Sequence, residues 1–107
     1  MTRQTDMLSR LRSLREASAL AWEMASDTCY VGQTDEIDVE RQAECQDAAD
    51  SALELWDAAI DAAEAEDIRA AVPTLFAAAA LAADWGDASH EIEAIELLAP
   101  AAEGGAR

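Results

Sequence analysis

Residues 34–66 read TDEIDVERQAECQDAADSALELWDAAIDAAEAE, and this stretch decides the fold. It contains neither glycine nor proline, and its apolar residues recur every three or four positions, which is the spacing of one face of an α-helix. That apolar face consists of Cys45, Ala48, Ala49, Ala52, Leu55, Trp56, Ala59, Ile60 and Ala63. The pattern predicts one long helix that begins near Thr34 or Asp35, with either as N-cap, and ends between Glu64 and Asp67.

A row of acidic residues follows the other side of this predicted helix at spacings of 4, 3, 3, 4, 3, 4 and 3. Its members are Glu40, Glu44, Asp47, Asp50, Glu54, Asp57, Asp61 and Glu64. At this spacing neighbouring carboxylates lie about 5–6 Å apart on one flank, and the row is about 36 Å long. The separation is close to that of phosphates along a nucleic-acid strand. Each like-charge pair destabilises a helix by a few tenths of a kcal/mol, and only Arg41 lies within the segment to neutralise any of them. The row therefore either serves a partner or is screened by solvent.

Three further segments show the apolar spacing of an amphipathic helix. They cover residues 5–25, 67–84 and 87–100. Asp67 suits the N-cap of the second, Pro73 either starts or kinks it, Gly86 ends it, and Pro100 is expected to stop the last helix.

No segment shows the alternating pattern of a strand. We therefore predict an all-α fold, a four-helix antiparallel bundle with one long central helix. Residues 1–100 form a single helical domain in this prediction, and residues 101–107 form a flexible C-terminal tail. The side chains expected to be mostly buried are Trp22, Leu55, Trp56 and Ile95.

Charge is distributed unevenly along the chain, which has 23 acidic residues, seven arginines and no lysine, for a net charge of −16. Residues 1–15 carry four arginines against Asp6 (4 − 1 = +3), and residues 16–107 carry three arginines against 22 acids (3 − 22 = −19). Such a field repels nucleic acid and anionic membranes and attracts basic surfaces. We expect a basic protein as partner, with no direct binding of nucleic acid or membrane. Whether the chain is a monomer or a homodimer stays open.

Arg10, Arg12 and Arg15 have two interpretations. They either pair with acids of residues 34–66 across a helical hairpin, which we favour because the neighbouring acidic field is strong, or form a small basic patch of their own.

Catalytic and metal chemistry find little support in the sequence. His90 is the only histidine, and no Glu-x-x-His motif or EF-hand loop is present. Cys29 and Cys45 are expected to be free thiols, because the chain has neither a secretion signal nor an apolar run long enough to span a membrane, and both absences predict a cytoplasmic protein. We predict no catalytic residue, no metal site and no cofactor, and hence no enzyme.

In its acidity, helical character, small size and row from Glu40 to Glu64, the chain resembles the DNA-mimic inhibitors of phages and mobile elements, of the anti-CRISPR or anti-restriction type. The resemblance implies that the protein occupies a basic nucleic-acid-binding surface on a host defence complex, with the row as the partner-binding surface. Two alternatives stay open. One is an acidic chaperone or immunity-type module that masks a basic partner, using Tyr30 and Trp85 as well as its charges. The other is a housekeeping helical protein adapted to high salt.

Overall fold

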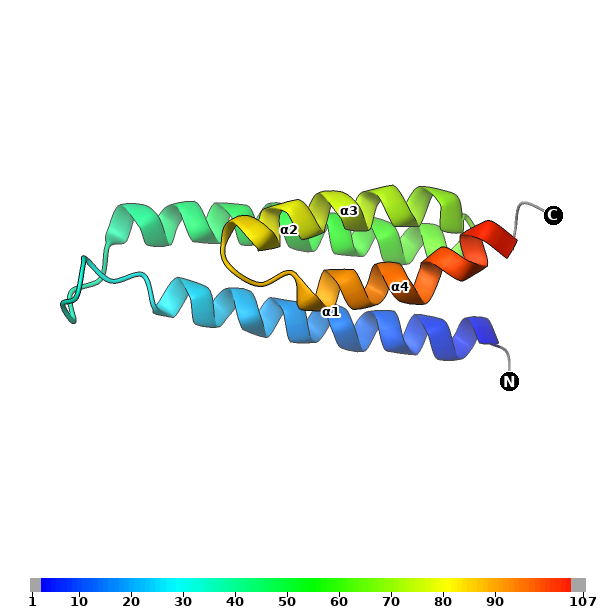
Figure 1. Ribbon diagram of the computed structural model, residues 1–107, viewed down its shortest axis with the longest axis horizontal. Helices are drawn as coiled ribbons and strands as arrows, with labels where there is room; N and C mark the ends of the chain where they lie inside the picture. The colour runs from blue at the N-terminus through cyan, green and yellow to red at the C-terminus, as the bar shows by residue number, and fades with distance from the viewer. Residues whose placement is uncertain (1–2, 105–107) are drawn as a thin grey trace.

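The computed structural model describes residues 3–104, with the side chains of residues 5–101, and its regular structure there consists of four α-helices. These are α1 (Arg3–Asp27), α2 (Val39–Glu64), α3 (Ile68–Asp84) and α4 (Ser89–Gly104). The chain reverses direction at each connection, so consecutive helices run antiparallel (Figure 1). The predicted all-α fold with four helices is confirmed. The expected arrangement with one long central helix is not confirmed. Helix α1 has 25 residues and α2 has 26, so the bundle has two long helices of nearly equal length.

Each helix packs against two others around one core: α2 against α1 and α3, and α4 against α3 and α1. The molecule is elongated, with extents of 55 × 23 × 17 Å. Because α4 begins well inside the bundle, the end that carries the α1–α2 loop is built mainly from α1, α2 and the last turns of α3 (Figure 1). This end has its own smaller apolar cluster.

The core is rich in alanine and has few large side chains. Its main cluster includes Leu11, Leu14, Trp56, Ile60, Leu75, Ile95 and Leu98, and the cluster at the loop end contains Trp22, Cys29, Cys45, Ala52 and Ala82. Trp22, Trp56 and Ile95 are buried as predicted, whereas Leu55 is only partly buried at the edge of the main cluster. Alanine on facing helices lets their backbones approach closely around these few large residues.

Helix α2 starts at Val39, and its N-cap is Asp38, three to four residues later than the predicted N-cap at Thr34 or Asp35. The Asp38 carboxylate accepts a hydrogen bond from the backbone N–H of Arg41 at 3.1 Å. The preceding residues form a tight loop, in which Tyr30 and Ile37 make an isolated antiparallel bridge. The backbone N–H of Asp38 donates to the carbonyl of Cys29 at 2.7 Å. This bridge holds the chain extended up to Asp38, so the acids before it cannot join the helix.

Both prolines lie inside helices. Asp67 caps α3 as predicted, accepting from the backbone N–H of Ala70 at 3.3 Å, and the helix continues through Pro73 to Asp84, just before Gly86. The expectation that Pro100 stops the last helix is wrong, because α4 continues to Gly104. A proline removes one intrahelical hydrogen bond and bends a helix without always ending it, and the last turns of α4 bend away from the line of its first turns (Figure 1). The proposed boundary at residue 100 therefore falls within a helix, and residues 105–107 of the predicted tail lie outside the described residues.

Candidate partner-binding surface

All eight residues of the acidic row lie on α2 and are exposed to solvent, and they are the only acidic residues of that helix. Six of them form no ion pair with any residue in the described part of the chain: Glu40, Glu44, Asp47, Asp50, Glu54 and Asp61. The remaining two are Asp57 and Glu64, which pair with arginines of α1. The row thus has an uncompensated part and a compensated end.

The division arises because the row is not straight. Its mean step from Glu40 to Glu64 is (64 − 40)/7, about 3.4 residues, which is shorter than the 3.6 residues of one helical turn. The row therefore winds around α2 by about 120° from its first to its last member. As a result, its C-terminal end reaches the side of α2 that packs against α1.

At that end, two arginines of α1 contact the row. Arg15 Nε donates to Asp57 Oδ1 at 2.9 Å and its Nη2 donates to Asp57 Oδ2 at 3.3 Å. Arg12 pairs with Glu64. The favoured pairing across a helical hairpin is confirmed for these two residues. It is wrong for Arg10, which pairs with Glu93 of α4, because two residues of helix turn its side chain to the opposite side of α1 from Arg12.

Arg41, the one cationic residue within α2, contacts an aromatic ring. Its guanidinium carbon lies 4.5 Å from the centroid of the Trp85 ring, a cation–π distance. Trp85 is accordingly half-buried beside the loop-end cluster, which makes it less suitable as a partner anchor than the sequence suggested. The N-terminal part of the row keeps its full negative charge.

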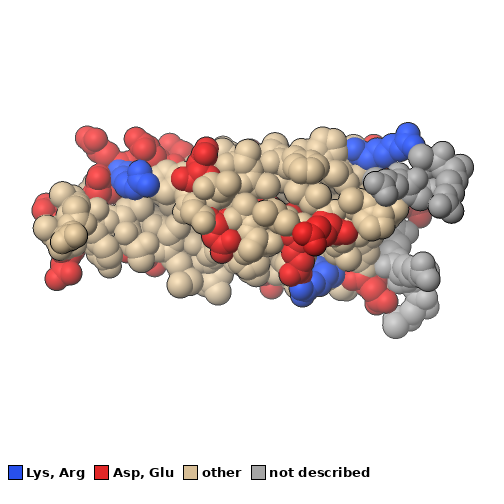
Figure 2. All heavy atoms as spheres, viewed as in Figure 1, with Lys and Arg blue, Asp and Glu red and all other residues tan. Residues whose placement is uncertain are grey.

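A groove of about 460 Å³ runs between α1 and α2 beside the row. Both of its walls carry carboxylates: Glu23 and Asp27 from α1, and Asp50 from α2. Figure 2 shows acidic side chains gathered around the end of the molecule that carries the α1–α2 loop. Sequence reasoning missed the α1 wall, although the spacing of four between Glu23 and Asp27 would have placed both on one flank of a helix.

A buried carboxylate was also missed. Glu91 of α4 is fully buried, and its Oε2 accepts hydrogen bonds from Trp56 Nε1 at 2.9 Å and from the Ser18 hydroxyl. Its Oε1 has no hydrogen-bond partner. Glu91 thus links α4 to α1 and α2 inside the core, and this role depends on contacts between distant segments that no local pattern reveals.

The two cysteines are free and buried near each other at the loop end. Burial, followed by the proximity of Cys29, raises the pKa of the Cys45 thiol. Cys29 donates its thiol hydrogen to the carbonyl of Ala25 at 3.2 Å. Both thiols therefore sit in the core and are poorly placed to act as nucleophiles.

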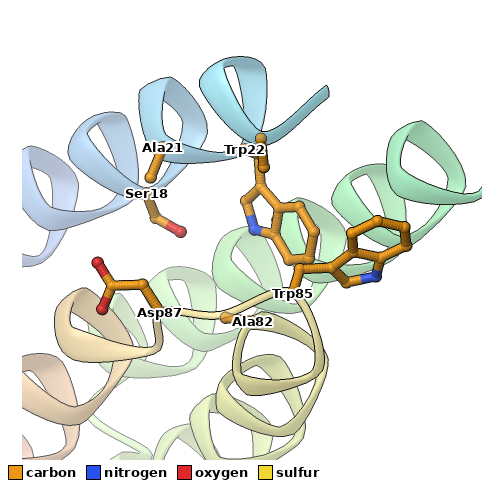
Figure 3. A pocket seen from close by; sticks show the side chains of 7 residues that line it. Ser18, Ala21, Trp22, Ala82, Trp85 and Asp87 are labelled. Carbon is orange, nitrogen blue, oxygen red and sulfur yellow. The ribbon is translucent and has the colours of Figure 1, made fainter. Parts of the chain in front are cut away.

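A small cavity of about 40 Å³ lies near the loop end of the bundle. Figure 3 shows it between α1 and the end of α3, with Ser18, Trp22, Trp85 and Asp87 around it. This volume suits a few water molecules rather than a substrate. Among residues 5–101, no group of three or more histidine, cysteine or acidic side chains is arranged to hold a metal ion.

Comparison of the chain with known protein families, with curated proteins and with solved structures finds no match. None of the helices within residues 3–104 combines the length and the apolar character needed to cross a bilayer.

Proposed function

We propose that this protein is a non-enzymatic inhibitor that presents carboxylates in place of nucleic-acid phosphates. It occupies the basic nucleic-acid-binding surface of a host defence complex in the cytoplasm, as anti-CRISPR proteins do. The observation that carries the proposal is the set of six exposed, unpaired carboxylates on one helix, whose only arginine is turned onto Trp85. These carboxylates therefore form no ion pair within the described part of the chain that a basic partner would have to break.

The geometry adds a second line of support. Carboxylates from α1 and α2 stand on the two walls of one groove, as phosphates of two strands flank a groove of duplex nucleic acid. Arginines and lysines of a target would form charge-assisted hydrogen bonds to them. Long-range attraction between the acidic surface and a basic channel would accelerate encounter, and this effect weakens with added salt.

The structure refines the residues in this proposal. Asp57 and Glu64 are engaged by Arg15 and Arg12, so they contribute less to a partner than the other members of the row. The acids of the groove's α1 wall join the surface in their place. The proposed contact set is Glu23, Asp27, Glu40, Glu44, Asp47, Asp50, Glu54 and Asp61.

A second candidate function is a module that masks a basic protein by a mixed apolar and acidic contact. The observation that favours it is the exposure of Tyr30, Val31 and Val39 beside the start of the acidic row. Replacing Tyr30 by serine separates the two functions. The substitution weakens binding in the masking function and leaves a purely electrostatic phosphate mimic nearly unchanged.

Affinity capture with a competition step tests the proposed function. The protein is immobilised and exposed to purified CRISPR effector and restriction complexes, and bound complexes are then challenged with their own duplex DNA or guide RNA. The account predicts retention of at least one complex and its release by the nucleic acid. Retention that nucleic acid does not disturb, or failure to retain any basic nucleic-acid-binding complex, would contradict it.

A further inference from the structure

The outer face of α3 differs in character from the acidic surface of α2. Between Arg69 and Asp84 this helix carries no charged residue. Its solvent-facing side consists of exposed apolar residues, namely Pro73, Phe76, Ala77, Ala80 and Ala83. Phe76 is 58% exposed, and Ile92 on the adjoining helix α4 is 50% exposed. Figure 2 shows an uncharged stretch in the upper middle of the view, where Figure 1 places α3. An apolar face this long is unusual on a chain with a net charge of −16 and indicates an interface.

The two ends of this face carry opposite charges. Arg69 stands at the N-terminal end of α3 and Asp84 at its C-terminal end, and both are exposed. Five arginines have described side chains, and four of them form an ion pair or a cation–π contact. Arg69 is the fifth and forms neither. Asp84 likewise pairs with no residue of the described part of the chain. These two charges therefore have no ion-pair partner among the side chains of residues 5–101.

The positions of the two charges make the face self-complementary. Arg69 and Asp84 are equally distant in sequence from the midpoint between Phe76 and Ala77. Two α3 helices that pack antiparallel about a twofold axis at this midpoint would bring each Arg69 to Asp84 of the partner subunit. A twofold axis makes each contact occur twice, so one charge pair forms at each end of the interface.

We propose that the protein is a homodimer that assembles in this way, through the apolar outer face of α3, with Phe76 at the centre and Arg69–Asp84 ion pairs at both ends. The opposite charges at the two ends of this face favour a second copy as its occupant. A copy that approached over α2 instead would bring carboxylates against carboxylates. Between Arg69 and Asp84 the face of α3 has no acidic residue and does not repel a second copy. The charges of Arg69 and Asp84 at its two ends attract that copy.

The dimer has a consequence for the acidic surface. Helix α3 packs between α2 and α4, while α1 packs against α2 and α4 on the far side of the core. A twofold axis that lies in the interface and perpendicular to α3 therefore leaves both α2 helices on the same side of the dimer. Two acidic rows would then form one larger surface. The dimer itself does not depend on the proposed function, and its test uses no target.

Sedimentation equilibrium of the full chain and of charge variants tests the dimer. The wild-type protein is expected to sediment with twice the mass of one chain, with tighter association at physiological salt than at low salt because salt screens the net charge. In a dimer of the Arg69→Asp variant, two acidic residues meet at each end of the interface. In a dimer of the Asp84→Arg variant, two arginines meet there. Each is expected to raise the dimer dissociation constant by roughly tenfold or more.

Sedimentation of an equimolar mixture of the two variants is the decisive measurement. In a heterodimer of Arg69→Asp with Asp84→Arg, both ends of the interface again join opposite charges, so the mixture is expected to regain the wild-type association. Glu16→Arg, a charge reversal on the exposed side of α1 across the core from α3, is the matched control and should leave the association intact. Circular dichroism establishes that each variant remains helical. A wild-type protein that stays monomeric up to millimolar concentration, or a dimer that neither α3 variant weakens, would overturn the proposal. Failure of the mixture to recover would also overturn it.

Discussion

Arg15 and Asp57 are joined by two parallel hydrogen bonds, from Nε to Oδ1 at 2.9 Å and from Nη2 to Oδ2 at 3.3 Å. This contact fastens α1 to α2 and, together with the proposed function, gives the acidic row two roles. At its C-terminal end the row helps to hold the bundle together. Towards its N-terminus the carboxylates face solvent and form no ion pair with any described residue, and there the row is available to a partner.

The two roles predict opposite effects on stability for the same chemical change. Asp57→Asn weakens the pair with Arg15 and should lower the free energy of unfolding by about 0.5–1 kcal/mol, since the pair is partly exposed. Asp47→Asn relieves repulsion from Glu44 and Asp50 and should raise the free energy of unfolding by a few tenths of a kcal/mol. Urea unfolding followed by circular dichroism measures both. Equal destabilisation by the two substitutions would contradict the division of the row.

Salt should stabilise the isolated protein. Six unpaired carboxylates on one helix repel one another, while the three ion pairs of the described side chains are all exposed and individually weak. Screening therefore removes more repulsion than attraction. The midpoint of thermal unfolding is expected to rise between low and physiological ionic strength. A midpoint that decreases over this range would mean that the ion pairs dominate.

The parts of the fold that follow from local patterns could be predicted from the sequence. The apolar spacing of residues 34–66 identified the long helix, and Asp67 identified the start of α3. The start of α2 could not be predicted, since it depends on the bridge between Tyr30 and Ile37, which joins residues on two sides of a turn. Pro100 was misjudged because a proline disturbs a helix without determining whether it continues.

The candidate surface was predictable to a similar degree. The row of acids and its pairing with Arg12 and Arg15 were visible in the sequence. The partner of Arg10 and the acidic wall on α1 were not, because both depend on how helices are placed around the core. The buried Glu91 is the clearest such case: its spacing from Ala94, Ile95 and Leu98 places it on the buried face of α4, but its hydrogen-bond partners lie on α1 and α2, where no local pattern reveals them.

Glu91 should be critical for stability through its hydrogen bonds. In Glu91→Ala, Trp56 Nε1 loses its acceptor and a cavity remains, so the free energy of unfolding should decrease by about 2–4 kcal/mol. Glu91→Gln keeps an acceptor oxygen for the indole and should cost less. Urea unfolding with tryptophan fluorescence distinguishes the two variants. Equal losses would show that the hydrogen bond to Trp56 contributes little.

Cys45 should make stability fall at alkaline pH. Burial raises the pKa of its thiol in the folded protein above that of an ordinary cysteine, so the folded state holds this proton more tightly than the unfolded state. The stabilisation is fully present below the unfolded pKa and is lost as pH rises through the folded pKa. Unfolding free energies measured between neutral and alkaline pH should decline more steeply for the wild type than for Cys45→Ala. Identical slopes would contradict this assignment.

The most direct test of the central claim is the effect of reversing the uncompensated row on binding to a retained defence complex. Glu44, Asp47, Glu54 and Asp61 are exposed and unpaired, so replacing all four with arginine changes the charge and spares the contacts of α1 with α2. A control substitution must also spare the ion pairs of the bundle, which excludes Glu93 because it pairs with Arg10. A matched control instead reverses four exposed acids off the row: Asp6, Asp35, Glu36 and Glu96.

Binding is measured by titrating labelled DNA off the complex with each variant, after circular dichroism has shown that both remain helical. The account predicts that the wild type and the control displace the DNA, with apparent affinity that decreases as salt is added, and that the row variant does not. Displacement by the row variant at the wild-type concentration would contradict phosphate mimicry and would move the contact to Tyr30 and its apolar neighbours.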